Sequence, residues 1–377
     1  MLRPDLPPED CSPECSESRA ATCPRPSGHF MIRQDITQAS GQRLLKSLFR
    51  GDRHPIKCHG TNMKILVWLQ HSTSHFSAQE RHLERLQNAF PNHDVVCCTS
   101  SEQVESHLPE TEIAIVWRFF QNQVIAAPNL RILATPAAGR DYFQVDLPAQ
   151  VTKIHGSFHG KLMAETALAY MLAANRGVVA SSRLQEKDPW PRDVVGEPMR
   201  LFQGSHVGIL GFGKIGQAIG KMAKLNGAAI TGIRKKSAPK IDWMTSKDQI
   251  ITLSDLDKSL PLFDHLVICL PRDPGTDHII NSQRLSLMKN EAWIHNLGRG
   301  NAIDEKALVH SLHTGLLAGA CLDVFEKEPL QESSPLRTLP NCLIMPHTSA
   351  MAPEYLDFFL DEFIPQAQDL MHSEENP

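Results

Sequence analysis

Residues 207–216 read Val-Gly-Ile-Leu-Gly-Phe-Gly-Lys-Ile-Gly, and this stretch decides the fold class. It places the spacing G-x-G-x-x-G directly after an apolar strand and at the start of a helix that continues over Gln217–Leu225. Gly211 permits a tight turn, Gly213 lets the backbone approach a pyrophosphate, and Gly216 permits close packing of the helix on the strand. The pattern predicts a dinucleotide-binding βαβ unit.

The start of the predicted helix supplies hydrogen-bond donors for the phosphates. The backbone N–H groups of Lys214 and Ile215 have no carbonyl partner within the helix, and the helix dipole favours negative charge at that end. A second apolar strand, Ala229–Ile233, follows at the distance that a βαβ unit requires. The alternative is a glycine turn that binds no ligand.

The residues after this second strand indicate which dinucleotide is used. An Asp or Glu there accepts hydrogen bonds from the adenosine ribose and selects NAD, whereas an Arg accommodates the 2′-phosphate of NADP. The strand is followed by Arg234, Lys235 and Ser237, so a guanidinium, an ammonium and a hydroxyl stand where the acid is expected. We therefore expect NADP(H) to be preferred over NAD(H). The alternative is a solvated basic turn that accepts either cofactor.

Apolar strands alternate with helices on both sides of the glycine motif, which predicts parallel α/β units. The strands expected before the motif are Lys64–Leu69, Val95–Thr99, Ile113–Trp117, Arg131–Ala134 and Val151–Ile154. Those expected from the motif onward are Val207–Leu210, Ala229–Ile233, His265–Cys269, Ala292–His295 and Gly319–Leu322. The expected long helices are Ala78–Phe90, Leu162–Asn175, which is apolar enough to be buried, and Pro353–Met371.

Length and composition narrow the class of protein. The chain of 377 residues is long enough for two or three domains, and its 41% hydrophobic and 21% charged residues are ordinary for a globular protein. The net charge of −4 gives no support to a nucleic-acid partner, and no apolar run reaches the roughly 18 residues of a membrane helix. Most of the nine cysteines stand singly in apolar runs, as reduced thiols do, so we expect a cytoplasmic protein.

Residues 1–62 differ from the rest of the chain. They are rich in Pro and Ser and show no sustained periodicity, so we expect a disordered extension. Cys11, Cys15, Cys23 and His29 form an alternative metal site, although their spacing matches no usual zinc pattern. Acidic residues near the start, together with the lack of an apolar core after them, argue against a signal peptide.

Three segments after the glycine motif extend the pattern. They are Asn296–Gly300 (NLGRG), Gly319–Pro329 (GACLDVFEKEP) and Pro346–Thr348 (PHT). In this order, and together with the glycine motif, they resemble the signature set of the D-2-hydroxyacid dehydrogenase family. The resemblance covers about residues 63–370, and four motifs in order are far more specific than any one of them alone.

The resemblance implies how the chain is divided into domains. A Rossmann domain that binds NAD(P), about residues 161–342, is inserted into a flavodoxin-like substrate domain made of residues 63–160 and 343–377. The extension, residues 1–62, stands outside both domains. The active site is expected in the cleft between the two domains. The strands and helices expected above are compatible with this division, although periodicity alone does not show that the substrate domain is discontinuous.

Three residues match the family's catalytic group. Arg299 matches the arginine that binds the substrate carboxylate and carbonyl, and a planar guanidinium can bind a 2-oxo acid at two oxygens. His347 matches the acid/base histidine, since reduction of a ketone needs a proton donor whose pKa is near the working pH. Glu328 matches the carboxylate that orients this histidine and raises its pKa. Without the resemblance, the three are interpreted as a surface arginine, a capping or core histidine and a solvated acid.

The resemblance also assigns further residues to binding of the cofactor and of the substrate. The resemblance assigns four residues beyond the glycine motif to the cofactor: Leu270, Pro271, Thr276 and Asp323. Asp323 matches the residue that hydrogen-bonds the nicotinamide carboxamide, with a structural turn as the alternative. The loop Thr135–Asp141 (TPAAGRD) matches the loop that binds the substrate carboxylate, through the backbone of Ala138 and Gly139. Arg140 replaces the usual apolar residue there, either as a solvated charge or as a group that favours an anionic tail.

By resemblance, the protein is an NAD(P)-dependent oxidoreductase that transfers a hydride between nicotinamide and a small 2-oxo or 2-hydroxy acid of the glyoxylate or hydroxypyruvate kind. A phosphoglycerate substrate stays open. Formate dehydrogenases share the fold but carry glutamine in place of the glutamate, so Glu328 favours hydroxyacid chemistry. The alternative is a non-catalytic, NAD(P)-sensing binding protein that resembles the C-terminal-binding corepressors. No metal is expected, and a homodimer is expected through Leu162–Asn175 and adjacent segments.

Overall fold

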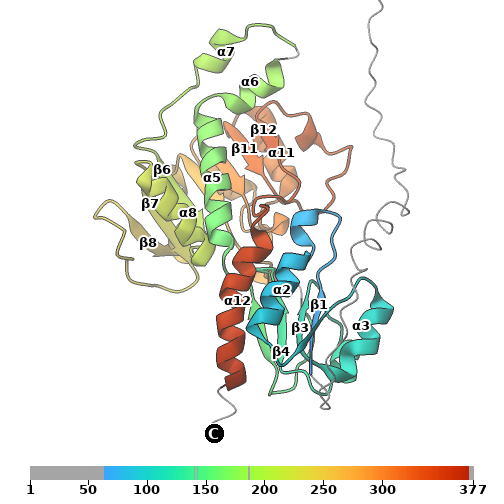
Figure 1. The fold of residues 1–377 in the computed structure, drawn as a ribbon. Helices are drawn as coiled ribbons and strands as arrows, with labels where there is room; N and C mark the ends of the chain where they lie inside the picture. The colour runs from blue at the N-terminus through green and yellow to red at the C-terminus, as the bar shows by residue number, and fades with distance from the viewer. Residues whose placement is uncertain (1–62, 140, 142, 186, 373–377) are drawn as a thin grey trace, which may run out of the picture. The chain divides into compact units, whose positions relative to one another are not determined.

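The computed structural model describes residues 63–139, 141, 143–185 and 187–372, and these residues form two parallel β-sheets, each covered by helices (Figure 1). The predicted α/β fold class is confirmed. The predictions for residues 1–62, including the alternative metal site, lie outside the described residues. Within the described part, no helix combines the length and the apolar character that crossing a membrane requires.

The first sheet has five parallel strands in the order β2-β1-β3-β4-β5, which is the flavodoxin-like order. Its strands are short and mostly apolar, and Ile65, Leu66 and Val67 of β1 are all buried because helices cover both faces of the sheet. Strands β1 to β5 span Lys64–Trp68, Asp94–Cys97, Thr111–Val116, Ile132–Thr135 and Thr152–His155.

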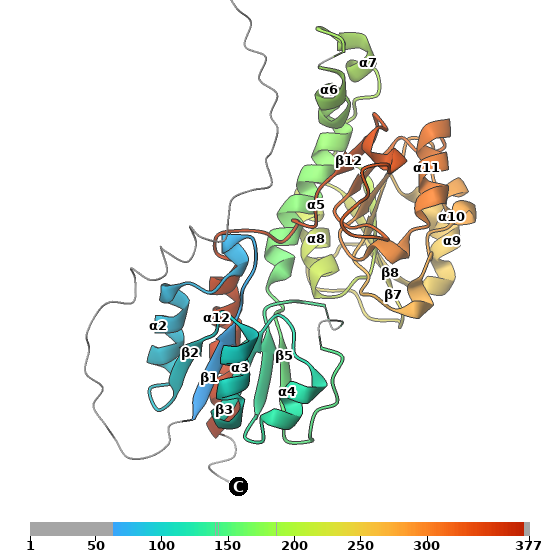
Figure 2. The same ribbon diagram turned by 90° about the vertical axis from the view of Figure 1, so that its right-hand side faces the viewer.

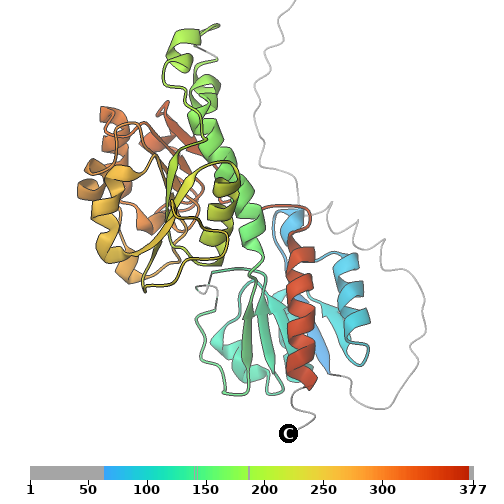
Figure 3. The same cartoon turned by 90° about the vertical axis from the view of Figure 1, so that its left-hand side faces the viewer.

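Helices lie on both faces of the first sheet (Figure 2), and each face has its own apolar core. The helices of this sheet are α2 (Glu80–Ala89), α3 (Ser101–His107), α4 (Gln121–Ala126) and α12 (Tyr355–His372). Leu86 of α2 and Phe359 of α12 pack with Ile65 on one face, whereas Val104 of α3 and Val124 of α4 pack on the other. Figure 3 shows α12 running along the strands of this sheet. The C-terminal helix therefore shares a core with strands that lie almost 300 residues before it in the chain.

The second sheet has seven parallel strands in the order β12-β11-β10-β9-β6-β7-β8. The chain starts at β6, moves outward to β7 and β8, and returns to the other side of β6 for β9 to β12. Ligands of such sheets bind at the carboxyl ends of the strands where the order reverses, which here is between β6 and β9. Strands β6 to β12 span His206–Leu210, Ala229–Arg234, Gln249–Thr252, His265–Ile268, Trp293–Asn296, Gly319–Leu322 and Cys342–Ile344.

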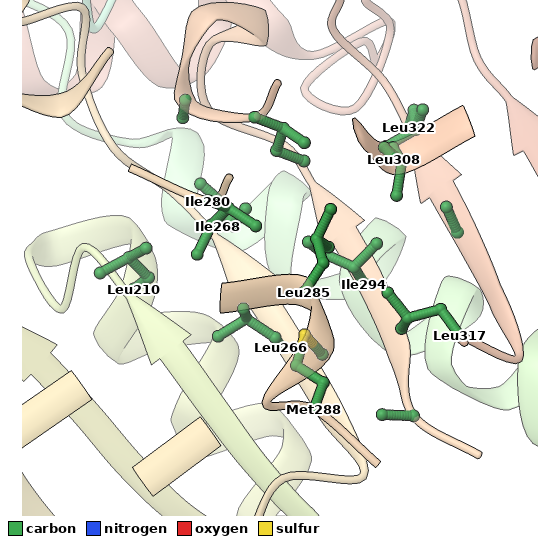
Figure 4. Close-up of a cluster of buried hydrophobic side chains, with 14 of the residues drawn as sticks. Leu210, Leu266, Ile268, Ile280, Leu285, Met288, Ile294, Leu308, Leu317 and Leu322 are labelled. Atoms are coloured by element: carbon green, nitrogen blue, oxygen red, sulfur yellow. The ribbon is translucent and has the colours of Figure 1, made fainter. Parts of the chain in front are cut away.

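Two helix layers bury the second sheet. Its helices are α5 (His159–Asn175), α8 (Lys214–Leu225), α9 (Leu256–Ser259), α10 (Ser282–Ser286) and α11 (Glu305–Thr314). Leu266 and Ile294 of the central strands pack against Leu285 of α10 and Leu308 of α11 on one face (Figure 4). α5 and α8 cover the opposite face, and one side of the predicted apolar helix is buried there, whereas Lys161, Glu165 and Leu172 on its other side are exposed.

Several short elements are not expected from the sequence. β8 and β12, of four and three residues, lie at the two edges of the second sheet and are only partly buried. Helices α6 (Val178–Leu184) and α7 (Arg192–Gly196) are too short to show a helical period, and they lie beyond the C-terminal end of α5 (Figure 3). The predicted elements are present with ends shifted by a few residues, and α5 begins at His159 rather than at Leu162.

Candidate active site

The glycine motif forms the turn between β6 and α8. Gly211 has a φ of +100°, which favours glycine, and a Cβ there would lie 2.7 Å from the backbone of Cys269. The N–H groups of Gly211 and Phe212 both donate to the carbonyl of Ile233, each at 3.1 Å. Because Ile233 is the penultimate residue of β7, these bonds hold the turn beside the carboxyl end of that strand.

Gly216 and Gly213, the other two glycines of the motif, are needed for different steric reasons. A Cβ at Gly216 would lie 2.4 Å from the carbonyl oxygen of Gly211, so α8 packs on the turn with no room for a side chain. A Cβ at Gly213 would have no atom within 4 Å, so the space beside this residue is open. The N–H groups of Lys214 and Ile215, in the first turn of α8, have no carbonyl partner within the helix. An open approach, free donors and the positive end of a helix fit a pyrophosphate.

The basic residues at the end of β7 are available to a ligand. Arg234 is partly buried, and Lys235 and Ser237 are exposed. The side chains of all three are without a hydrogen bond or ion pair to any residue that the structure describes. Their donors therefore fit the 2′-phosphate of NADP, and the preference for this cofactor stays a prediction.

A cavity of about 920 Å³ adjoins the glycine turn. Its lining includes seven of the predicted site residues, namely Ala138, Gly139, Ile215, Leu270, Pro271, Arg299 and His347. Two other predicted residues direct their side chains to protein partners, because Thr276 Oγ1 donates to the Asp273 carbonyl at 2.8 Å and Lys214 Nζ donates to Ser157 Oγ at 3.2 Å. The cavity thus joins predicted cofactor, substrate and catalytic positions.

Arg299 is oriented by two protein partners. Its Nε and Nη2 donate to the two carboxylate oxygens of Asp141 at 3.3 and 3.0 Å, and its Nη1 donates to the Gly298 carbonyl at 3.0 Å. A guanidinium has five N–H donors, so two remain on the terminal nitrogens. Arg299 is therefore held in place and still able to bind two oxygens of a ligand. Arg140, the neighbour of Asp141, lies outside the described residues.

His347 and Glu328 form a hydrogen-bonded pair. His347 Nδ1 lies 2.8 Å from Glu328 Oε2, and the N–H of Phe325 donates to Glu328 Oε1 at 3.0 Å. The hydrogen bond with Glu328 raises the pKa of His347, although burial opposes it. Burial also opposes ionisation of Glu328, but the bonds from His347 and Phe325 outweigh it and lower the pKa of that carboxyl. The pair favours a protonated imidazole, whose Nε2 is left for a ligand in the cavity.

The buried carboxylate of Asp323 holds the loop that carries His347. The N–H groups of Thr348 and Ser349 donate to its two oxygens at 2.7 and 3.0 Å, and the N–H of His347 donates to its main-chain carbonyl at 2.8 Å. His347 has a φ of +55°, which is unusual for a residue other than glycine and is maintained by these bonds. This geometry is the structural turn that the sequence left as an alternative, and a contact of Asp323 with nicotinamide stays a prediction.

Sequence reasoning missed several residues of the cavity wall. Trp117 and Arg118 follow β3 directly, and Trp117 Nε1 donates to the carbonyl of Phe76 at 3.0 Å. Their place after a buried parallel strand was the available signal. His159 and Tyr355 line the cavity from the starts of α5 and α12, with 2.9 Å between His159 Nε2 and Tyr355 Oη. Burial lowers the pKa of His159 to about 4, so it is neutral near pH 7.

The chain is similar to known proteins over most of its described part. The family model described as "D-isomer specific 2-hydroxyacid dehydrogenase, NAD binding domain" matches residues 168–349. The chain is 33% identical over 230 residues to the glyoxylate reductase of Thermococcus onnurineus, covering 59% of this chain and 67% of that protein. It is 34% identical over 234 residues to glyoxylate/hydroxypyruvate reductase B of Pectobacterium carotovorum, covering 60% and 72%.

A solved structure extends the similarity to both sheets. It is the crystal structure of a D-isomer specific 2-hydroxyacid dehydrogenase from Xanthobacter autotrophicus Py2, in complex with NADPH and MES. The TM-score is 0.66 at 26% sequence identity, and the match covers 81% of this chain and 95% of that chain.

Proposed function

The chain belongs to the D-isomer specific 2-hydroxyacid dehydrogenase family, and we propose that it interconverts a small 2-oxo acid and its 2-hydroxy acid with a nicotinamide nucleotide. The predicted family and the predicted oxidoreductase class are confirmed by these similarities. One observation carries the proposal, which is that a single cavity joins Arg299, able to bind an acid, and His347, able to deliver a proton. Small 2-oxo acids of the kind after which the relatives are named, glyoxylate and hydroxypyruvate, are the proposed substrate class.

Arg299 is proposed to bind the acid. Asp141 occupies one edge of the guanidinium, so the two remaining N–H groups are left for a carboxylate oxygen and the carbonyl oxygen of the substrate. The backbone N–H groups of Ala138 and Gly139, which line the same cavity, are proposed to hold the rest of the carboxylate. Binding at several points orients the carbonyl carbon before reaction, which is a large part of what an active site contributes.

His347 is proposed to move the proton. The cofactor, when bound at the glycine turn, supplies the hydride, while the protein supplies orientation and the proton. His347 is protonated with the help of Glu328 and donates from Nε2 to the carbonyl oxygen, which becomes the hydroxyl. The positive charge of Arg299 stabilises the negative charge that develops on this oxygen. In the reverse direction, neutral His347 accepts the hydroxyl proton.

Turnover of 2-oxo acids by the full chain tests this proposal against the non-catalytic, NAD(P)-sensing alternative. We expect reduction of glyoxylate or hydroxypyruvate, and we expect His347→Ala to lower kcat by about 10²–10⁴-fold with unchanged cofactor affinity. His313→Ala, at an exposed histidine of α11 outside the cavity, is the matched control. Cofactor binding without reduction of any acid in the panel would favour the alternative.

We also infer that NADP(H) is preferred over NAD(H). Arg234, Lys235 and Ser237 take the place of the ribose-binding acid, and their donors are free of described protein partners. The Xanthobacter relative was crystallised with NADPH, which supports the same inference. The ratio of kcat/KM for NADPH to that for NADH should exceed one and should invert in Arg234→Asp, but not in Lys258→Ala, an exposed lysine of α9. A preference for NADH in the wild type would overturn the inference.

A second copy of the chain is proposed to cover the region around α6 and α7. Trp190 is 79% exposed, Val194 63% and Val178 55%, which is unusual for large apolar side chains so close together in the chain. This region adjoins α5, where the resemblance implies a dimer contact. We expect a dimeric mass by light scattering, a monomeric mass for Trp190→Glu, and no change for Leu225→Glu on α8. A monomeric wild type would overturn the proposal.

A cytoplasmic location is proposed from the state of the cysteines. All five cysteines in the described residues are free thiols. Cys98, Cys321 and Cys342 are buried, and Cys97 and Cys269 are partly buried. Burial raises the pKa of Cys269 to about 12, which keeps it in the unreactive thiol form. Such thiols persist in a reducing compartment. Fractionation of cells against a cytoplasmic marker tests the location, and recovery outside the cytoplasm would contradict it.

A further inference from the structure

The cavity holds one positive charge that no described carboxylate balances. Among the described residues, its lining has two arginines, Arg118 and Arg299, and neither Asp nor Glu. Asp141 balances Arg299 and Glu328 balances His347. The side chain of Arg118 is exposed and has no hydrogen bond or ion pair with the part of the chain that the structure describes. An unpaired guanidinium in a concave site attracts an anion.

Arg118 stands on a wall whose backbone is held in place. It follows β3, the central strand of the first sheet, by two residues. The neighbouring Trp117 is fixed by its hydrogen bond to the Phe76 carbonyl and by ring contacts with Phe76 and Tyr355, at centroid distances of 5.9 and 6.2 Å. Phe119, on the other side of Arg118, is buried.

The loop after β1 adds neutral donors to the same lining. His71, Ser72 and Thr73 line the cavity, and the N–H of Thr73 donates to His71 Nδ1 at 3.0 Å. Because Nδ1 accepts this bond, Nε2 is the ring nitrogen left as an N–H donor. His71 is also in edge contact with Phe76, with a centroid distance of 5.1 Å, so its ring is positioned. The first-sheet side of the cavity thus offers a cation and N–H or O–H donors.

We propose that Arg118 binds a second anionic group, so that the natural substrate is a 2-oxo acid with a carboxylate or phosphate at the end remote from the reacting carbonyl. The inference rests on the proposed function, in which Arg299, Ala138 and Gly139 hold the first carboxylate. A monoanion such as glyoxylate leaves Arg118 without a partner. A planar guanidinium suits a carboxylate or phosphate because it can bind two of its oxygens.

Matched pairs of substrates test the proposal on the full chain with NADPH. Oxaloacetate differs from pyruvate by a distal carboxylate, and 3-phosphohydroxypyruvate differs from hydroxypyruvate by a phosphate. We expect the wild type to have a higher kcat/KM for one dianion than for its matched monoanion, and the pair with the larger ratio identifies the distal group. In Arg118→Gln, kcat/KM for that dianion should fall by about 10- to 100-fold, since a charge-assisted hydrogen bond is lost.

Controls separate recognition from folding and from overall charge. The monoanions should keep their kcat/KM within about threefold in Arg118→Gln, and Lys153→Gln, which removes an exposed charge of β5 outside the cavity, should leave both classes unchanged. Compared with Arg118→Gln, Arg118→Lys should restore part of the activity on the dianion, because lysine carries the positive charge but lacks the planar guanidinium that binds two oxygens. Melting temperature and NADPH affinity of each variant show whether it is folded.

Three results would overturn the proposal. The first is a wild type that is equally active on each dianion and its matched monoanion. The second is an Arg118→Gln variant in which kcat/KM falls equally for both classes, and the third is one in which it falls for neither. Reduction of monoanions with any of these results removes the second anion site and leaves the proposed function intact. A wild type that reduces no 2-oxo acid at all removes the proposed function, and this inference with it.

Discussion

Alanine at Gly213 and alanine at Gly216 add the same methyl group three residues apart, yet the structure predicts different consequences. At Gly216 the new Cβ would lie 2.4 Å from the carbonyl oxygen of Gly211, closer than real Cβ contacts. At Gly213 it would have no atom within 4 Å, and the φ of −86° suits alanine. We therefore expect Gly216→Ala to perturb the folded protein and Gly213→Ala to perturb only the bound dinucleotide.

The size of the first effect follows from the contact at Gly216. An ordinary Cβ contact begins at 3.4 Å, so the start of α8 has to move by 3.4 − 2.4 = 1.0 Å away from the turn. Overpacking typically costs about 1–3 kcal/mol, and each kcal/mol lowers the melting temperature of a large domain by about 2–4 °C. We expect a decrease of about 2–12 °C for Gly216→Ala. Cofactor affinity should fall as well, because the phosphate donors move with the helix.

The second effect appears only when the cofactor binds. The methyl group of Gly213→Ala occupies the open approach that the pyrophosphate needs, so the Kd for NADPH should rise about tenfold or more. The melting temperature without cofactor should stay within about 1 °C of the wild type, because the added group meets nothing. Gly196→Ala in α7, where a Cβ also meets no atom within 4 Å, is the matched control and should change neither quantity.

Thermal unfolding with and without NADPH, together with a fluorescence titration of NADPH, measures both quantities. Normal NADPH affinity in Gly213→Ala would refute the placement of the pyrophosphate at this turn. An unchanged melting temperature in Gly216→Ala would refute the steric argument, since it would mean that α8 moves away at no cost. Equal effects of the two substitutions would refute the distinction between them.

Three further substitutions test the catalytic pair, the arginine and the loop. Glu328→Gln replaces the charged acceptor that raises the pKa of His347 with a neutral amide. As pH rises, kcat/KM for reduction, which needs protonated His347, should therefore be lost at a lower pH than in the wild type; an identical pH profile would exclude Glu328 from the mechanism. Asp141→Asn weakens the orientation of Arg299, so KM for the 2-oxo acid should rise about tenfold with the Kd of the cofactor unchanged; wild-type KM would contradict this. Asp323→Asn places an amide N–H donor opposite a buried backbone N–H, so the free energy of unfolding should fall by about 1–3 kcal/mol. An unaltered melting temperature would contradict the structural role of Asp323.

The proposed catalytic residues were predicted by resemblance and not by spacing. Arg299, Glu328 and His347 lie in three separate segments, and their composition alone fits a surface arginine, a solvated acid and a capping histidine. The structure shows His347 bonded to Glu328 and places His347 with Arg299 in the lining of one cavity. It also shows Asp323 bonded to the loop of His347. The sequence had left two roles open for Asp323, a hydrogen bond to nicotinamide and a structural turn.

What the sequence determined by itself is local. The strands, the long helices and the glycine turn follow from apolar periodicity and from steric limits within about ten residues, so Gly216, whose Cβ would meet the Gly211 carbonyl, is explained by its own neighbours. What only the tertiary structure decided are contacts between distant segments. Arg299 meets Asp141 across 158 positions of the chain, and His159 meets Tyr355 across 196. Such contacts depend on how two sheets pack and where α12 returns, and no local pattern encodes them. For the same reason, only the folded chain shows that Arg118 lines the cavity without a described partner.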